Sequence, residues 1–216
     1  MNVEEKILDR AHELFVKQGI RSVTMDELAQ SLGISKRTIY EHFVDKKTLV
    51  EEDALRFHLF LKGETDRLIN EADNVIQGVT RVMQFVKGIL QVVTSMYFAD
   101  MKRYYPTAFE HISQKREMRK ADVTKVLVKR GIDQGVFRSD VNVDLVSFFI
   151  NGVVLADHEI MCEINGLKYG DFERDVIFAY LLGIATVKGR VLIKKETECY
   201  FSQMNMFGTE IPKVKF

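Results

Sequence analysis

Residues 23–43 read VTMDELAQSLGISKRTIYEHF. Thr24 and Glu27 have the spacing of a capping box, in which the threonine accepts from the Glu27 amide and the glutamate side chain reaches back. Gly33 suits a turn with a positive φ, and Ser35 is a favourable N-cap for a second, short helix. This stretch therefore predicts a helix, a glycine turn and a helix, which is the arrangement of a helix-turn-helix.

The segments on either side of this stretch also have helical patterns. Before it, five apolar residues share one helical face that ends before Gly19, namely Ile7, Leu8, Ala11, Leu14 and Phe15. After it, Asp45 is expected to cap a fourth helix. We expect an all-α protein with a three-helix domain at residues 1–47 and a larger helical domain at 48–195. The tail at 196–216 has no clear periodicity and is left unassigned.

Composition limits the possible classes of protein. The chain has 216 residues, of which 46% are hydrophobic, so it can bury a sizeable core. Its 31 basic and 31 acidic residues balance, so any contact with nucleic acid must be a local patch. The N-terminus is unlike a signal peptide, and the longest apolar run, Val176–Ala185, is shorter than the roughly 20 residues that cross a bilayer. Cys162 and Cys199 lie far apart and fit free thiols in a reducing compartment, with a disulfide between the two as the alternative. We expect a cytoplasmic protein with no membrane contact.

Cations occupy the tips of two successive predicted helices. Lys36 and Arg37 directly follow the cap of the third helix, and Lys46 and Lys47 directly follow the cap of the fourth. The helix N-terminus already carries a partial positive charge, so cations there are unfavourable. An incoming phosphate would resolve the conflict, because N-terminal amides and lysines together bind anions. One such pair would read as a solvated surface, whereas two pairs around a helix-turn-helix favour DNA binding.

The stretch 23–43, followed by Asp45 and Lys46, resembles the DNA-binding domain of the tetracycline-repressor (TetR/AcrR) family over about residues 3–55. The resemblance implies a three-helix domain, a homodimer and repression that a ligand relieves. It also implies the DNA contacts. The positions that match phosphate contacts of the family are Thr24, Tyr40 and Lys46. The positions that match residues facing the major groove are Ser35, Lys36, Arg37, Thr38 and His42.

The chemistry of these side chains agrees with that division. Lys36 and Arg37 can donate to guanine O6 and N7, and the Thr38 methyl group can touch thymine. A tyrosine hydroxyl such as that of Tyr40 suits a phosphate. His42 fits equally well as a residue that complements the C-terminal dipole of its helix. Two acidic residues do not belong to this set. Glu41 either accepts from cytosine N4 or points sideways. Asp26 departs from the basic or neutral residues that some members of the resembling family carry at this position, which argues against base contacts from the second helix.

The remainder of the chain predicts further helices. Apolar residues at three-four spacing predict one helix through 79–97 that is buried on more than one side. A charged helix is expected from about 107 to 134, ending at Gly135. Asn142 is expected to cap the next helix, and Asp171 the last, which continues to about residue 195.

Two of these helices, at about 143–163 and 172–194, are expected to pack against the equivalent helices of a second copy and form a four-helix dimer interface. The segment Gly131–Arg138 resembles the connection that precedes the dimerisation helices of the family. Glycine inside a helix costs about 1 kcal/mol relative to alanine, and close approach of two helices is one reason to accept it. The candidate interface residues are Gly152, Ala156, Ala179 and Gly183. The alternative is a purely intramolecular core.

The middle helices are rich in methionine and aromatic residues. Such side chains suit a small apolar or aromatic effector, although at helical spacing they also serve as ordinary core. The pocket candidates are Met83, Met96, Tyr97, Met101, Tyr104, Tyr105, Phe109, Phe148 and Phe149. His158 and Cys162 are four residues apart, but a metal site needs more ligands than this segment offers. Since no motif for a catalytic or cofactor site is present, we expect no enzyme, no metal and no cofactor.

The leading hypothesis is a homodimeric repressor of transcription that binds double-stranded DNA at a palindromic operator and is released by a small-molecule effector. A second hypothesis keeps DNA binding without effector control, as in an architectural or chromosome-organising protein. A third makes the helical domain a small-molecule carrier or an enzyme, with the helix-turn-helix incidental.

Overall fold

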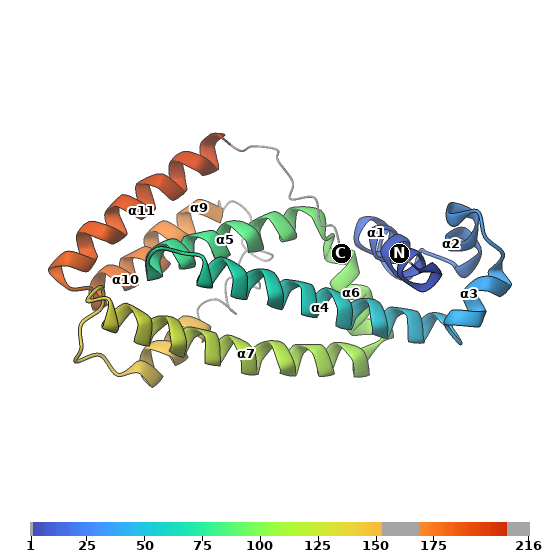
Figure 1. Cartoon of the computed structure of the whole chain (residues 1–216), viewed down its shortest axis with the longest axis horizontal. Helices are drawn as coiled ribbons and strands as arrows, with labels where there is room; N and C mark the ends of the chain where they lie inside the picture. The colour runs from blue at the N-terminus through green and yellow to red at the C-terminus, as the bar shows by residue number, and fades with distance from the viewer. Residues whose placement is uncertain (1, 153–168, 207–216) are drawn as a thin grey trace. The chain divides into compact units, whose positions relative to one another are not determined.

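The computed structural model describes residues 2–152 and 169–206, and within these ranges the chain is helical and contains no strand (Figure 1). The all-α fold class is therefore confirmed. The helices are α1 Val3–Gln18, α2 Met25–Leu32, α3 Lys36–His42, α4 Lys46–Asn70, α5 Val75–Val92, α6 Ser95–Tyr104, α7 Pro106–Asp133, the helix Val143–Gly152, α9 Tyr169–Phe172, the π-helix Glu173–Phe178, α10 Ala179–Ile184 and α11 Val187–Met206.

The chain forms two compact units. Of the described residues, the first unit contains 2–66 and 84–116, and the second contains 67–83, 117–152 and 169–206. The first unit therefore holds α1, α2, α3 and α6, and the second holds the helix Val143–Gly152 together with α9, α10 and α11. Helices α4, α5 and α7 contribute residues to both units.

The caps of the N-terminal helices largely follow the predictions. Thr24 Oγ1 accepts from the Glu27 amide at 3.1 Å, but the Glu27 carboxylate accepts from Gln18 Nε2 at 2.9 Å and does not close the capping box. The prediction was thus right for the threonine and wrong for the glutamate. A complete capping box starts α1, where Asn2 and Glu5 bind each other's backbone amides at 2.8 and 2.9 Å.

The turn between α2 and α3 is built as the sequence predicts. Gly33 adopts a left-handed conformation with φ of 66°, and its amide donates back to Gln30 at 3.2 Å. Ser35 then caps α3 by accepting from the Thr38 amide at 3.1 Å. The core beneath this turn is apolar and fully buried, with Phe15, Ile39 and Phe43 packed together with residues of α4 and α6.

The predicted helix through 79–97 is wrong, because the chain bends between α5 and α6. The Thr94 amide leaves the helical pattern and donates to the Val16 carbonyl of α1 at 3.0 Å. Among the described helices, none is by itself long and apolar enough to span a membrane. Helices α5 and α6 pass that test of length and composition only as a pair, and they are bent by 77° at their junction.

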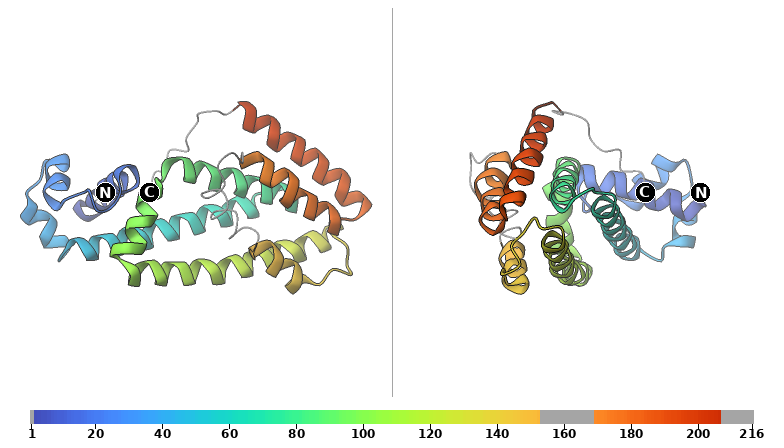
Figure 2. Two further views of the ribbon diagram at one scale, coloured as in Figure 1. Left: turned by 180° about the vertical axis from the view of Figure 1, so that it is seen from behind. Right: turned by 60° about the vertical axis from the view of Figure 1, so that its left-hand side comes forward.

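The prediction of one last helix at 172–194 is also wrong. Asp171 lies inside the helical run and pairs with Arg174 at 2.7 Å, so it is not the cap. The run ends with α10, and α11 begins after a break and reaches Met206, into the tail that the sequence left unassigned (Figures 1 and 2). The caps predicted at Gly135, which has φ of 67°, and at Asn142, which accepts from the Leu145 amide at 3.0 Å, are confirmed.

The break between α10 and α11 has a long-range cause. The segment before the helix Val143–Gly152 docks there, with the Arg138 amide donating to Ile184 at 3.0 Å and the Thr186 amide donating to Val136 at 2.9 Å. Thr186 Oγ1 accepts from the Gly189 amide at 2.9 Å, which caps α11. Backbone partners some 50 residues away thus replace the helical hydrogen bonds at this point.

The close approach at Gly189 gives a stability prediction. A Cβ atom at Gly189 would lie 1.9 Å from the Val136 carbonyl oxygen, so the backbone would have to shift. We expect Gly189→Ala to lower the free energy of unfolding by about 1–3 kcal/mol, as for other overpacked sites. Gly63→Ala is the control: Gly63 lies inside α4 with no atom within 4 Å of the added methyl group, so stability should rise by about 0.5–1 kcal/mol. Urea unfolding followed by circular dichroism measures both, and equal midpoints for Gly189→Ala and the native chain would contradict the prediction.

Candidate nucleic-acid interface

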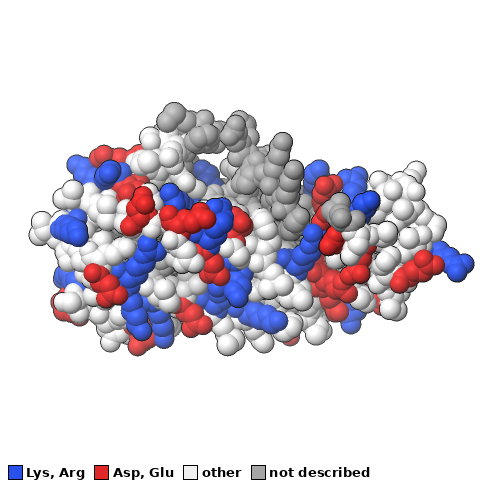
Figure 3. Space-filling view, in the orientation of Figure 1, with Lys and Arg blue, Asp and Glu red and all other residues white. Residues whose placement is uncertain are grey.

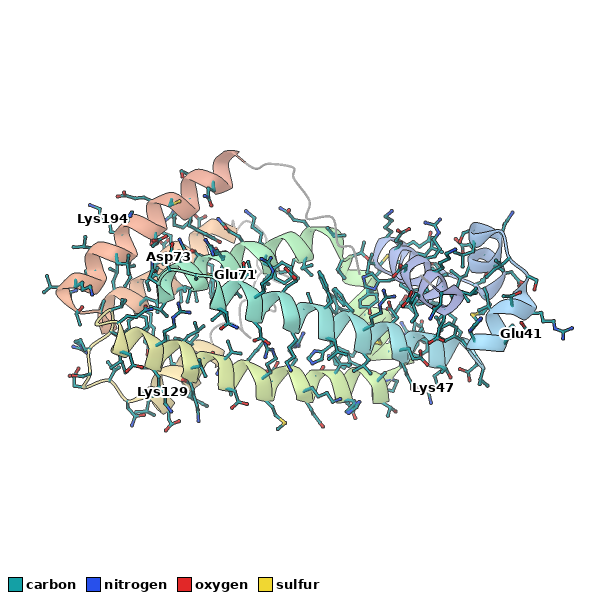
Figure 4. The ribbon with its side chains drawn as sticks, in the orientation of Figure 1. Glu41, Lys47, Glu71, Asp73, Lys129 and Lys194 are labelled. Carbon is teal, nitrogen blue, oxygen red and sulfur yellow. The ribbon has the colours of Figure 1, made fainter. Side chains whose placement is uncertain are left out.

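Helix α3 presents one polar face because its apolar residues are anchored. Ile39 of α3 and Phe43, the residue that follows this helix, are fully buried. Their burial leaves the remaining face of α3 to solvent, where the side chain of Arg37 is 89% exposed and Tyr40 is 43% exposed. The candidate major-groove residues of α3 therefore lie on an accessible surface. Glu41 of α3 and Lys47 of α4 also lie on the outside of the ribbon (Figure 4).

Hydroxyl groups fix the first turn of α3. Ser35 Oγ accepts the Thr38 amide and lies 2.9 Å from Thr38 Oγ1. These two candidate DNA contacts are therefore held in place by each other. This arrangement orients Lys36 and Arg37, which belong to the same turn.

The two basic residues at the start of α3, Lys36 and Arg37, each have an exposed acidic neighbour. Lys36 Nζ donates to Asp26 Oδ2 at 2.8 Å, and Arg37 Nε donates to Glu41 Oε1 at 3.1 Å. The Asp26 contact raises the pKa of Lys36. Solvent-exposed ion pairs are weak, so a phosphate or a base edge can replace these carboxylates. The ion pair with Lys36 also gives Asp26 a role that does not require contact with DNA bases.

The start of α4 contains two lysines in different positions. Asp45 Oδ1 caps the helix by accepting from the Thr48 amide at 2.7 Å and from the Thr48 hydroxyl at 3.0 Å, and these bonds lower the pKa of Asp45. Lys47 is 65% exposed and lies 3.8 Å from Glu51. Lys46 instead turns back to the backbone, with its Nζ 2.6 Å from the Ile20 carbonyl.

The other two candidate DNA contacts lie beside helix ends. The Thr24 hydroxyl caps α2. His42 ends α3, and its Nδ1 is 4.0 Å from Glu4 Oε2. This position of His42 agrees with the alternative in which it complements the C-terminus of α3. Its contact with DNA stays a prediction, as do the other proposed contacts. On the face shown in Figure 3, basic and acidic side chains are intermixed, as the balanced composition implies.

A buried polar network connects α1, α4 and α6 inside the first unit. Asp53 Oδ1 lies 2.7 Å from His12 Nδ1, and the Tyr97 hydroxyl donates to Asp53 Oδ2 at 3.0 Å. Burial and the neighbouring carboxylate raise the pKa of Tyr97 well above its usual value. The sequence analysis missed His12 and Asp53. The signal was a polar residue on each otherwise apolar helix face, His12 four residues after Leu8 and Asp53 four residues after Leu49.

The pocket candidates lie in several places. Tyr97 and Met101 are buried in the core of the first unit, where Tyr105 and Phe109 pack against them, and Met83 packs against the core of the second unit. Met96 and Tyr104 line a shallow surface hollow of the first unit together with Arg21 and Asp100. Phe148 and Phe149 are exposed on the second unit. The described residues do not gather these nine side chains in one cavity, and an effector pocket stays a prediction.

The described candidate dimer residues lie on helices of the second unit that also carry exposed apolar residues. Gly152, Ala179 and Gly183 are exposed, whereas Ala156 lies outside the described residues, as do His158 and Cys162. Leu145, Phe148 and Leu182 are also exposed beside them, with Phe148 at 80%. The rings of Phe149 and Tyr180 stack at 4.2 Å and join the helix Val143–Gly152 to α10. Over the described residues, no group of three or more His, Cys, Asp or Glu side chains could hold a metal ion.

Comparison with known proteins relates the chain to regulators of transcription. Residues 7–52 match the family described as "Bacterial regulatory proteins, tetR family". The "HTH-type transcriptional repressor KstR2" of Mycolicibacterium smegmatis is 29% identical over 153 residues, which cover 68% of this chain and 73% of that protein. The biofilm-operon negative transcriptional regulator IcaR of Staphylococcus aureus is 38% identical over 50 residues, or 23% of this chain and 27% of that protein.

A solved structure extends the likeness of fold beyond the helix-turn-helix. A TetR-family transcriptional regulator from Marinobacter aquaeolei superposes with a TM-score of 0.68 over 93% of this chain and 99% of that chain, at 19% identity. The likeness of fold therefore extends over most of the chain, whereas the family model matches residues 7–52 alone. The matched relatives are regulators and not enzymes.

The buried network gives a second stability prediction. Tyr97→Phe removes the hydroxyl donor and leaves a buried Asp53 oxygen without this hydrogen bond, so the free energy of unfolding should fall by about 1–3 kcal/mol. The control is Tyr104→Phe, whose exposed hydroxyl accepts from Arg21 at 2.9 Å and should matter much less. Chemical unfolding of both variants measures the difference. A Tyr97→Phe chain as stable as the control would show that the hydroxyl does not serve Asp53.

Proposed function

We propose that the chain, whose residues 7–52 match the tetR family of bacterial regulatory proteins, is a homodimeric repressor that binds a palindromic operator and leaves it when a small effector binds. The observation that carries the proposal is the anchored and exposed helix α3. Ile39 and Phe43 fix it in the core, and Lys36, Arg37 and Tyr40 face solvent on its outer side.

The outer face of α3 matches the edges of base pairs in the major groove. Arg37 uses Nε for Glu41, and its terminal nitrogens can donate to O6 and N7 of one guanine. Lys36 offers a second donor next to it. The hydroxyls of Thr24 and Tyr40 and the ammonium of Lys47 suit phosphates, which set the orientation of the protein and carry no sequence information.

Two copies are needed to read a palindrome. The half-sites of such an operator lie one helical turn apart, about 34–36 Å, and each copy reads one half. The exposed apolar face around Phe148, Leu145 and Leu182 supports a two-fold interface, because such faces are usually covered in soluble proteins. Among the described residues, no neighbouring atom lies within 4 Å of a Cβ atom placed at Gly152 or Gly183, which would permit close contact with a second copy.

Release by an effector is the remaining part of the proposal. Methionine and aromatic side chains of α5, α6 and α7 favour a largely apolar or aromatic compound. Such a compound lowers operator affinity only by as much as it prefers a conformation in which the two α3 helices no longer fit the half-sites.

Arg37→Ala tests the DNA-binding role of α3. The probe is a duplex that the native chain selects from a random library, and binding is measured by fluorescence anisotropy at two salt concentrations. Loss of a bidentate arginine should weaken binding to this duplex about tenfold to a hundredfold and relax the preference for guanine at one position. Lys194→Ala, at an exposed position of α11 (Figure 4), is the control and should bind normally. A native chain that does not distinguish the selected duplex from random DNA would refute regulation at an operator.

Phe148→Glu tests the dimer. A charge placed in a covered apolar interface is strongly unfavourable, so sedimentation equilibrium should show at least a tenfold weaker self-association than for the native chain. Val126→Glu, at an exposed apolar position of α7, should leave the dimer intact. A native chain that is monomeric at all concentrations, or a variant that dimerises equally well, contradicts the proposed interface.

A further inference from the structure

Lys46 differs from the other basic residues around α3 in the direction of its side chain. Its Nζ donates to the Ile20 carbonyl at 2.6 Å and to the Val23 carbonyl, and the Arg21 carbonyl lies at 3.5 Å. All three carbonyls belong to the turn between α1 and α2. An ammonium group has three donors, so the carbonyls of this turn occupy the group that a phosphate would need.

The turn requires such a donor. Its residues follow Gly19, where α1 ends with φ of 84°, and precede α2, so their carbonyls lie outside the helical hydrogen-bond pattern. Ile20 and Val23 are fully buried, which brings their carbonyls to the edge of the core. Buried carbonyls without a donor are costly. Lys46 supplies that donor from the first turn of α4, where burial lowers the pKa of its amine.

Helix α6 holds the same turn from its amide side. Asp100 Oδ2 accepts from the Arg21 amide at 2.7 Å, and the Arg21 guanidinium donates to the Tyr104 hydroxyl at 2.9 Å. The approach is close: a Cβ atom at Gly19 would lie 2.9 Å from Asp100 Oδ2. The turn is therefore bound through its carbonyls to α4 and through its amide to α6, with all these residues inside the first unit.

We infer that Lys46 is a positioning residue for DNA binding and not a phosphate contact, and that Asp100 positions the same turn from α6. Together they fix residues 20–23 and thereby the direction of Thr24 and of the start of α2. The inference rests on the proposed DNA-binding function. It departs from the role that the family resemblance implies for Lys46, and it assigns a role to Asp100, which the sequence did not single out.

The two roles differ in how binding depends on salt. A lysine that neutralises a phosphate releases counterions, so its loss reduces the slope of log K against log salt by about 0.9. A positioning residue touches no phosphate, and its loss lowers affinity by a similar factor at every salt concentration. The slope of log K against log salt therefore distinguishes a phosphate contact from a positioning residue, whereas the affinity at one salt concentration does not.

The experiment compares Lys46→Met, Lys47→Met and Asp100→Ala with the native chain, using the selected duplex over a series of salt concentrations. Lys47 is the matched control, because it is the adjacent lysine and is exposed. Lys47→Met should reduce the slope by about 0.9. Lys46→Met and Asp100→Ala should each weaken binding about tenfold with the native slope, because each removes the side chain that binds backbone groups of the turn.

Two results would overturn the inference. One is a Lys46→Met slope reduced as much as that of Lys47→Met, and the other is an Asp100→Ala chain that binds as tightly as the native one. If Lys46→Met does not fold, as judged by circular dichroism, Asp100→Ala decides through its own affinity and slope. These outcomes are distinct from failure of the proposed function, which would appear as a native chain that does not prefer the selected duplex to random DNA.

Discussion

The candidate nucleic-acid interface depends on one constraint, the burial of Phe15, Ile39 and Phe43 in a single apolar cluster. Helix α3 has seven residues, and helices this short are not stable in isolation. Its direction is therefore fixed by packing and not by its own hydrogen bonds. The same cluster contains residues of α4 and α6, so the support for α3 comes from a compact unit that extends beyond the first three helices.

Polar groups inside this unit add direction to the apolar packing. Hydrophobic contacts tolerate small shifts, whereas a buried carboxylate or carbonyl must meet its partner at a defined distance. Asp53 joins α1 to α4 and α6 through His12 and Tyr97. Lys46 and Asp100 do the same for the turn that follows α1. These contacts connect α1, and the turn between α1 and α2, to helices later in the chain.

The sequence predicted the features that depend on neighbours in the chain. The caps at Thr24, Ser35 and Asn142 and the glycine turn at Gly33 are local, since cap and partner are a few residues apart. Features set by distant partners were missed. The bend at Thr94 depends on Val16, and the break before α11 depends on Val136 and Arg138. Periodicity continues through both points, because apolar residues on either side still face a core.

The candidate site shows the same division. The exposure of Lys36, Arg37 and Tyr40 followed from the helical spacing of Ile39 and Phe43. The direction of Lys46 did not, because the carbonyls that it binds lie more than 20 residues earlier in the chain. The methionine and aromatic residues could not be divided between core and pocket by spacing alone. The structure buries Tyr97 and Met101 and exposes Phe148, although all lie in similar patterns.

Under the proposed function, the acidic partners of Lys36 and Arg37 have a consequence for how the protein searches a genome. Asp26 and Glu41 offset the positive charges of Lys36 and Arg37 as long as no nucleobase displaces these two carboxylates. Affinity for arbitrary duplexes comes almost entirely from uncompensated positive charge, so each wrong sequence holds this surface only briefly. The recognition helix is thereby freed quickly from the excess of unrelated DNA that any regulator meets, and residence time becomes the property that distinguishes the correct sequence.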